Sequence, residues 1–428
     1  MNSLETVYDK VIVGGGIAAL VTAYECLRTA RENGAPIPRI IVLAKELNAP
    51  AKASSNITLG IDGFEDSPDH VGSQQIKTMM LAATQRLQSI VQDENIECRL
   101  SMGYQLLASD SRNPMTEKPV TAQESMTRTL AFLASHFGYK SSDFYPLKNP
   151  SEHIGFGGFT EVWETQTIGQ INTPELLRGL IKAITKMGGE VREGVAYENH
   201  TTVSGQTILN TSHGVYKSSA VPLLATGAVH LKSIGLPIEP LYAGALHVKL
   251  SSEDQRKLRP GGKPIAFCDT NISGDVFWGG LDSTGVLTIG FGEIAGLKDQ
   301  AVYDRARDGL NDALRERFHK LLPTLYGKYD NVMSFSFGPQ AMTQNKFPIV
   351  GRLPNYDVSG GWCTRGIVGS VAAAQAYARM FVLGDDKSLK IWEDLNVTEL
   401  RNIPSSPERP SISSSPQQFY VLNKPPPI

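Results

Sequence analysis

Residues 11–20 read VIVGGGIAAL, and this stretch decides how the chain begins to fold. Val11–Val13 is a run of β-branched apolar residues, which predicts a buried strand. Glycines follow, and small and apolar residues then recur at helical spacing as far as Asn33–Gly34, a pair that favours a turn. A second apolar strand is expected at Arg39–Leu43. The order strand, helix, strand predicts a βαβ unit.

The turn of this unit carries the pattern GxGxxA, with Gly14, Gly16 and Ala19 at its fixed positions. The first glycine permits a tight turn, the second lets backbone approach a pyrophosphate, and the small third residue lets helix pack on strand. The helix start, at Ile17, Ala18 and Ala19, then directs unpaired N–H groups toward the phosphates. The pattern predicts a Rossmann-type dinucleotide site in an α/β fold. A glycine-rich turn of another α/β protein is the alternative.

The second strand departs from the usual dinucleotide pattern at its end. An acidic residue commonly stands there and binds the ribose hydroxyls, but this chain has Ala44. The next residues are Lys45 and Glu46. We expect either that Glu46 reaches back to the ribose or that Lys45 and backbone groups serve it.

Composition narrows the class of protein. The chain has 428 residues, which suggests two domains, and 41% hydrophobic with 20% charged residues is typical of a globular protein. A net charge of −2 without like-charge blocks argues against a nucleic-acid surface. No apolar stretch approaches ~20 residues and Met1–Lys10 lacks a leader pattern, so we expect no membrane span and no secretion.

Cysteine and histidine spacing suggest neither a metal site nor a disulfide framework. The four cysteines are far apart without a CxxC pair, and no histidine pair has metal-ligand spacing. Scattered cysteines fit a reducing compartment, so we expect a cytoplasmic protein.

Later segments extend the opening pattern. They are the hydroxyl-rich loop Ala53–Asn56, the helix start Asn172–Leu177 with Thr173 as its expected N-cap, the small-residue turn Leu224–Ala228, and the glycine-rich turn Gly361–Gly369 before a helix. In this order after GxGxxA, they resemble the D-amino-acid-oxidase-like family of FAD-dependent oxidoreductases, which includes glycine oxidase and sarcosine oxidase. The resemblance extends from about Tyr8 to about Asp386 and implies FAD rather than NAD.

The resemblance implies an extended FAD with its diphosphate on the first helix. Besides the residues of the first turn and Lys45 and Glu46, it places along the cofactor Ser54, Ser55, Asn56, Tyr197, Thr226, Gly227, Arg365, Gly366, Ile367, Val368 and Gly369. Tyr197 would offer backbone to the adenine. A helix beginning near Gly369 would direct its positive end at the flavin pyrimidine ring and stabilise the anion formed when N5 accepts a hydride. Gly366 and Gly369 would let backbone approach the ring.

A covalent flavin is not expected. Some relatives bond their flavin through a cysteine in the segment that corresponds to Gly338–Asn345. That segment has no cysteine here, so the resemblance implies non-covalent, dissociable FAD.

The family's fold implies two interleaved domains. Segments 1–100, 172–230 and 335–388 would form the FAD-binding domain, and segments 101–171 and 231–334 a β-rich, α+β substrate domain. Strand-like runs at Gly103–Ala108, Ala243–Leu250, Val276–Trp278 and Val286–Phe291 fit the second domain, and Gln74–Gln92 is expected to be an amphipathic helix.

Residues 404–428 form a Pro/Ser-rich C-terminal tail. Such composition predicts a disordered or surface-draped segment. Its apolar residues Phe419–Leu422 would suit docking onto the body of the protein, onto a second copy of the chain or onto another protein partner.

The substrate side departs from the family at a key arginine. Amino-acid oxidases of this family hold the substrate carboxylate with a guanidinium, which binds it bidentately. In glycine-oxidase-like members one such arginine aligns with Gln340, and the loop Gly279–Gly285 also lacks a basic residue and carries Asp282. We therefore do not expect a simple small amino acid as substrate. Asp282 and Gln340 would instead favour a cationic or hydroxyl-rich one.

The remaining catalytic candidates are Arg365 and Trp278. Arg365 stands in the flavin-facing turn, where it would hold an anionic substrate group or neutralise reduced flavin; an exposed arginine is the alternative. Trp278 would form a wall of the substrate pocket, and an ordinary core role is the alternative.

These features predict a FAD-dependent oxidoreductase that acts on a small molecule. We expect oxidation of a CH–NH or CH–NH2 donor by hydride transfer to flavin N5, with O2 or another acceptor taking the electrons. A 2-hydroxy-acid or alcohol dehydrogenase on the same scaffold, and a flavin-binding accessory (maturation) protein, are the alternatives.

Overall fold

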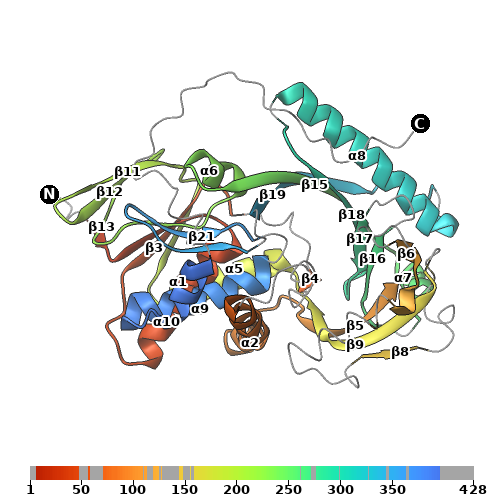
Figure 1. The fold of residues 1–428 in the computed structure, drawn as a ribbon, viewed down its shortest axis with the longest axis horizontal. Coiled ribbons are helices and arrows are strands. Elements are labelled where there is room, and N and C mark those ends of the chain that lie inside the picture. Colours follow the sequence, from red (N-terminus) through yellow and green to blue (C-terminus); the bar gives the residue numbers. More distant parts are fainter. Residues whose placement is uncertain are drawn as a thin grey trace.

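A computed structural model describes residues 6–47, 56–57, 71–108, 110–112, 119–124, 127, 144–147, 155, 159–260, 262–270, 276–297, 299–325, 327–343, 347–362 and 366–395. Their strands form a six-stranded, a nine-stranded, a four-stranded and a two-stranded sheet. Figure 1 shows the six-stranded sheet with its helices toward one end of the molecule and the nine-stranded sheet toward the other.

The six-stranded sheet has the order β10-β3-β2-β14-β21-β20. Its strands are β2 (Lys10–Val13), β3 (Ile40–Ala44), β10 (Glu190–Glu193), β14 (Leu223–Leu224), β20 (Ile349–Arg352) and β21 (Asp357–Gly360). Neighbouring strands are parallel except β20 and β21, which are antiparallel. β2 and β3 are buried on both faces, as their β-branched composition requires.

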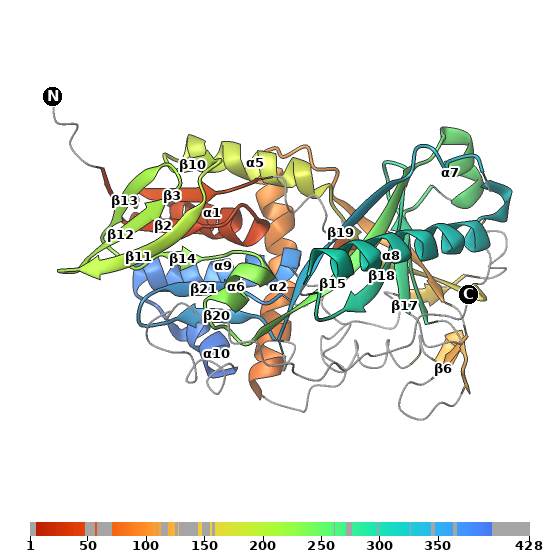
Figure 2. The ribbon, with the colours of Figure 1, turned by 90° about the horizontal axis from the view of Figure 1, so that it is seen from above.

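A helical layer packs on one face of this sheet and shares one core with it. Its helices are α1 (Ile17–Glu32), α2 (Val71–Asp93), α5 (Thr173–Lys186), α9 (Gly366–Leu383) and α10 (Lys387–Leu395). α1 and α9 lie side by side, and Figure 2 shows α2 beside them, between the two halves of the molecule. α9 is long and apolar enough to cross a membrane, but most of it is buried in this core.

The other face of the six-stranded sheet packs against the four-stranded sheet and helix α6 (Ala228–Ser233). The four-stranded sheet has the order β1-β13-β12-β11. Its strands are β1 (Val7–Tyr8), β11 (Tyr197–Val203), β12 (Gln206–Thr211) and β13 (Gly214–Ser218).

The nine-stranded sheet has the order β19-β15-β18-β17-β16-β5-β9-β4, with β8 also paired to β9. Its strands are β4 (Asn56–Ile57), β5 (Ser101–Ala108), β8 (Phe144–Pro146), β9 (Glu161–Gln170), β15 (Ile238–Lys249), β16 (Ile265–Thr270), β17 (Val276–Leu281), β18 (Val286–Ile294) and β19 (Ser334–Thr343). Helix α8 (Gln300–Leu321) packs on one face through Leu310, Leu314 and Phe318. The short elements α7 (Ser252–Leu258), β6 (Ser111–Arg112), β7 (Pro119–Val120) and the 3-10 turn Pro323–Leu325 complete the described structure.

The predicted fold class is confirmed, and two details differ from the expectation. Asn172, not Thr173, is the N-cap of α5, because its side-chain oxygen accepts from the Glu175 N–H at 3.0 Å and Thr173 is the first helical residue. β4 and β19 pair within the nine-stranded sheet, although they fall in segments expected for the FAD-binding domain. The division into two domains stays a prediction, and the pairing favours a boundary after Thr343 rather than at 335.

An ion pair inside the six-stranded sheet joins two segments that lie far apart in the sequence. The Lys10 ammonium lies 2.6 Å from the Asp357 carboxylate, with side-chain exposures of 2% and 8%. Tyr377 on α9 donates to the same carboxylate oxygen at 2.5 Å, and Lys10 also donates to the Val221 carbonyl at 2.6 Å. Burial, and then the Asp357 charge, raise the pKa of Tyr377 well above its usual value, so it stays a donor. The contacts connect β2, β21 and α9.

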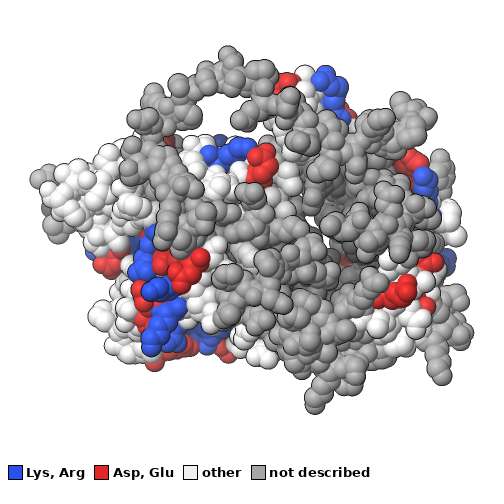
Figure 3. Space-filling view, viewed as in Figure 1, with Lys and Arg blue, Asp and Glu red and all other residues white. Residues whose placement is uncertain are grey.

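Further ion pairs fasten the helices around this centre. Arg86 of α2 binds the buried Glu25 of α1 through both carboxylate oxygens, at 2.7 and 2.8 Å. Arg352 at the end of β20 binds Glu393 of α10 at 2.8 Å. Figure 3 shows positive and negative side chains intermixed on the surface over this helix.

The buried pair yields a stability prediction. Replacing Lys10 with Met leaves Asp357 as an unpaired buried charge, so we expect the free energy of unfolding to fall by about 3–5 kcal/mol. Urea denaturation measures this change. The control is Lys232→Met, which removes a 2.6 Å pair with Glu239 whose partners are half exposed and should cost under about 1 kcal/mol. An equal loss of unfolding free energy in the two variants would contradict a special role for the buried Lys10–Asp357 pair.

Candidate functional site

Successive turns line the carboxyl edge of the six-stranded sheet, where ligands bind in open parallel sheets. In sheet order they are residues 194–196 after β10, 45–47 after β3, 14–16 after β2, 225–227 after β14 and 361–362 after β21. The residues expected at the adenine, ribose, diphosphate and flavin parts of the cofactor therefore follow one another along this edge.

Close backbone contacts hold these turns together. Gly14 has a φ of +144°, and a Cβ there would lie 2.1 Å from the Ala225 carbonyl oxygen. A Cβ on Gly15 would lie 2.1 Å from the Glu46 carbonyl oxygen. The glycines are therefore required for the turns to approach one another.

The start of α1 suits an anion. Gly16 is the N-cap with extended backbone (φ −92°, ψ 177°), and within the described structure it has no side-chain cap and no acidic residue in the first turn. The N–H groups of Ile17, Ala18 and Ala19 are thus directed out of the helix at the sheet edge, where the helix dipole favours a negative charge. This arrangement fits a diphosphate.

The corner beside β3 contains an acidic residue that the sequence reasoning missed. Lys45 and Glu46 are exposed there. Glu193, the last residue of β10, accepts from the Leu47 N–H at 3.0 Å. The neighbouring Val195 N–H donates to the Ala44 carbonyl at 3.0 Å. Glu193 therefore supplies a carboxylate near the position where the end of β3 lacks one; only the pairing of β10 with β3 could reveal this.

A polar cluster joins the adenine side to the turn after β14. The Tyr197 hydroxyl lies 2.6 Å from Nδ1 of His200, and Thr226 Oγ1 lies 2.7 Å from Nδ1 of His230. The Tyr197 and His230 rings meet edge to face, 5.7 Å apart. Burial raises the pKa of Tyr197 to about 12 and lowers the pKa values of both histidines. All these side chains are therefore neutral near pH 7, and His230 hydrogen-bonds the Thr226 hydroxyl.

The residues expected along the flavin lie partly inside and partly outside the described structure. Ser54, Ser55 and Arg365 lie outside the described residues. Asn56 lies in β4, which pairs with β9 of the nine-stranded sheet. Gly366–Gly369 form the first turn of α9, and this turn contacts Trp362.

Trp278 and Gln340 lie on the same face of the nine-stranded sheet. Gly244 faces α8, since a Cβ there would meet Leu310 at 2.7 Å. Trp278 pairs with Gly290 and covers it, and Gly290 pairs with Ala245, which is on the face opposite α8. Gln340 shares this face by the alternation along β19, but β15 and β18 separate it from Trp278. The two residues are not direct neighbours.

The described side chains between Trp278 and Gln340 are uncharged and mostly small. In the described strands this surface consists of Leu241, which pairs with Gln340, and of Ala243, Ala245, Gly290, Ser336 and Gly338. His247, which the sequence reasoning missed, adjoins it, with its ring nitrogens 3.1 Å from Thr288 Oγ1 and 3.0 Å from Ser336 Oγ. Burial lowers the pKa of His247, so its ring is neutral.

Asp282 has a local role. Its Oδ1 accepts from Thr284 Oγ1 and from the Val286 N–H, both at 2.7 Å. These bonds close the turn between β17 and β18. The carboxylate is therefore engaged by its own turn, which weakens the expectation that it would favour a cationic substrate.

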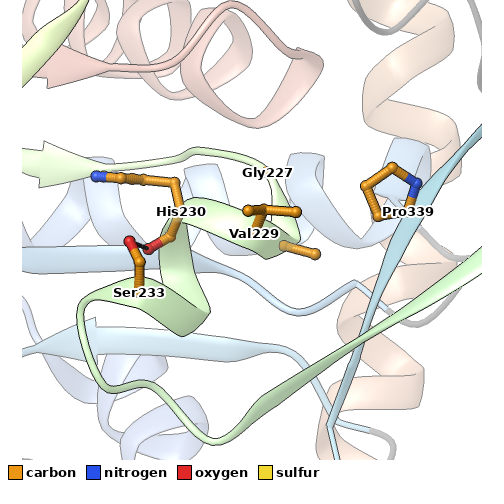
Figure 4. A pocket seen from close by; sticks show the side chains of 6 residues that line it. Gly227, Val229, His230, Ser233 and Pro339 are labelled. Carbon is orange, nitrogen blue, oxygen red and sulfur yellow. Dashed lines mark hydrogen bonds between the residues drawn. The ribbon is translucent and has the colours of Figure 1, made fainter. Parts of the chain in front are cut away.

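A hollow of about 480 Å³ lies between α6 and β19 (Figure 4). It is lined by Gly227, Ala228, Val229, His230, Ser233 and Pro339. Pro339 faces the opposite side of β19 from Gln340 because successive strand residues alternate. The hollow is therefore separate from the face that carries Trp278 and Gln340.

The glycine turn yields a binding prediction. Gly15→Ala forces the turn away from Glu46, so we expect FAD affinity to fall at least tenfold, ~1.4 kcal/mol, as measured by titrating apoprotein with FAD. Gly309→Ala on α8 is the control, because a Cβ there meets nothing within 4 Å. Unchanged affinity in the Gly15 variant would contradict the site.

Comparison with known proteins agrees with this geometry. Residues 9–380 match the family model of FAD dependent oxidoreductases. The probable oxidoreductase OrdL of Haemophilus influenzae is 22% identical over 409 residues, which are 91% of this chain and 86% of that protein.

Solved structures share the fold. Glycine oxidase from Geobacillus kaustophilus superposes with a TM-score of 0.66 at 17% identity, covering 87% of this chain and 94% of that one. L-proline dehydrogenase from P. horikoshii gives 0.63 at 14% identity, covering 93% and 100%. L-amino acid deaminase from Proteus myxofaciens gives 0.64 at 15% identity, covering 90% and 92%. The glycine turn and the uncapped start of α1 agree with the family match, which covers most of the chain. The chain therefore belongs to the DAO family and is a FAD-dependent oxidoreductase.

Proposed function

We propose that the enzyme oxidises a CH–NH or CH–NH2 donor other than a simple small amino acid, by hydride transfer to N5 of non-covalently bound FAD. The proposal rests on the described sheet face between Gln340 and Trp278, whose residues are uncharged and mostly small, and on the amide at position 340 in place of a guanidinium. Similar folds include a glycine oxidase, an L-proline dehydrogenase and amino acid deaminases. These similar enzymes are named for amino acids, which supports a nitrogen-bearing donor.

FAD would extend along the carboxyl edge of the six-stranded sheet. The N–H groups of Ile17, Ala18 and Ala19 would hold the diphosphate. Lys45, Glu46 or Glu193 would serve the ribose and Tyr197 the adenine, while the segment from Arg365 to Gly369 would lie along the flavin. Ser54, Ser55, Asn56, Thr226 and Gly227 would complete the site. When bound, the flavin supplies the electron-accepting ring.

The chain's own residues would orient the donor. Trp278 would provide a flat apolar wall and exclude water, and the Gln340 amide would hydrogen-bond an uncharged group. Arg365 would add a positive charge at the flavin end. Holding the donor carbon over the ring is the main requirement of this chemistry, because the cofactor carries the electron transfer.

The donor class is tested by anaerobic reduction. Loaded protein is mixed with amines, small amino acids and 2-hydroxy acids, and loss of the oxidised flavin absorbance is recorded. We expect secondary or primary amines without an adjacent carboxylate to bleach the flavin fastest. Bleaching by hydroxy acids alone would favour the dehydrogenase alternative, and no bleaching by any donor would favour an accessory role.

The residue at position 340 should control carboxylate preference. Gln340→Arg supplies a bidentate guanidinium, so we expect kcat/KM for small amino acids, relative to a carboxylate-free amine, to rise about tenfold, ~1.4 kcal/mol. Gln340→Leu is the matched control, since it removes the amide without adding a charge. The same ratio in both variants would remove Gln340 from the substrate site.

A further inference from the structure

The first turn of α9 lies against an indole ring. A Cβ on Gly369 would lie 3.1 and 3.2 Å from Cε3 and Cζ3 of Trp362, and a Cβ on Gly366 would lie 3.7 Å from the Trp362 Cβ. Trp362 thus crowds the side-chain space at Gly369, whereas at Gly366 it is in ordinary van der Waals contact. Gly369, which is expected to let backbone approach the flavin, therefore also accommodates a protein side chain.

The same turn is supported from α2. Met80, which is 1% exposed, places its Cε 3.8 Å from a Cβ at Gly369. Gly361, directly before Trp362, has a φ of +71°, which bends the chain at that point. Trp362 therefore packs closely against the first turn of α9 at Gly369, and Met80 borders the same position.

The rest of α9 is fixed independently. Its residues from Ile367 to Ala378 are nearly all buried, and Tyr377 is tied to Asp357. Trp362 is only partly buried. Core packing therefore holds α9, including Ile367 and Val368 of its first turn, and Trp362 adds the tight contact at Gly369 that fixes the fine position of this turn.

We infer that Trp362 is a positioning residue whose indole holds the first turn of α9 and thereby tunes how readily the bound flavin accepts electrons. The inference rests on the proposed placement of the flavin at this turn, but not on the substrate. A helix start within reach of the ring stabilises its reduced, anionic form. Displacing the turn weakens that stabilisation and lowers the reduction potential.

The test measures the midpoint potential of bound FAD, its absorption spectrum and its affinity, and needs no donor. For Trp362→Ala we expect reduced flavin to lose about tenfold in binding relative to oxidised flavin, a shift of about −30 mV for a two-electron couple. In Gly369→Ala the added methyl group would press against the Trp362 indole and displace the same turn, so the potential should shift in the same direction.

A rescue variant separates positioning from general loss of packing. Phe is smaller than Trp, so Trp362→Phe leaves room for the added methyl, and the double variant with Gly369→Ala should shift the potential less than the sum of the single changes. If Trp362→Ala does not fold, Trp362→Phe and its double variant with Gly369→Ala still test whether Trp362 positions the turn.

Trp392 on α10 provides the matched control. It is fully buried in the same core, so Trp392→Phe should lower the melting temperature and leave the potential unchanged. The inference is overturned if neither Trp362→Ala nor Gly369→Ala moves the potential, or if Trp392→Phe moves it equally. Failure of every amine to bleach the flavin would overturn the proposed function and leave this result standing.

Discussion

The buried charge of Lys10 constrains how the six-stranded sheet and its helices pack together. An ammonium group buried at the start of a central strand requires an equally buried counter-ion, and Asp357 supplies it from 347 positions later in the chain. Tyr377 adds a donor from α9 to the same carboxylate. The GxGxxA turn directly follows β2, and the turn before α9 follows β21. The ion pair therefore joins β2 and β21 across β14, and these two strands precede the turns expected at the diphosphate and at the flavin.

Strand order converts this constraint into a binding edge. β10, β3, β2, β14 and β21 all run in the same direction, so every loop that leaves them at the carboxyl end opens on one side. An extended dinucleotide fits such a row. The nine-stranded sheet contributes a different surface, on which Trp278 and Gln340 face away from the α8 layer.

Local patterns predicted the elements of the fold, and long-range pairing decided the details of the site. The βαβ unit follows from residues 10–44, because hydrophobic periodicity and glycines act over short distances. The N-cap of α5 was assigned to Thr173 because Asn172 and Thr173 are both good caps, and only geometry separates them. Glu193 and His247 were missed since their importance comes from partners on other strands. The roles of Trp362 and Asp282 depend on side-chain contacts that no spacing in the sequence encodes.

The interleaved strand order also bears on how the protein is made. β2 gains both of its strand neighbours once β14 is made, but the counter-ion of Lys10 lies in β21 and Tyr377 lies in α9, so the ribosome must deliver residues up to about Tyr377 before the buried ion pair is complete. Until then the emerging amino-terminal βαβ unit exposes the apolar side of α1, and its lysine has no counter-charge. Exposed apolar surface makes such an intermediate prone to aggregation, and chaperones bind surfaces of this kind during synthesis.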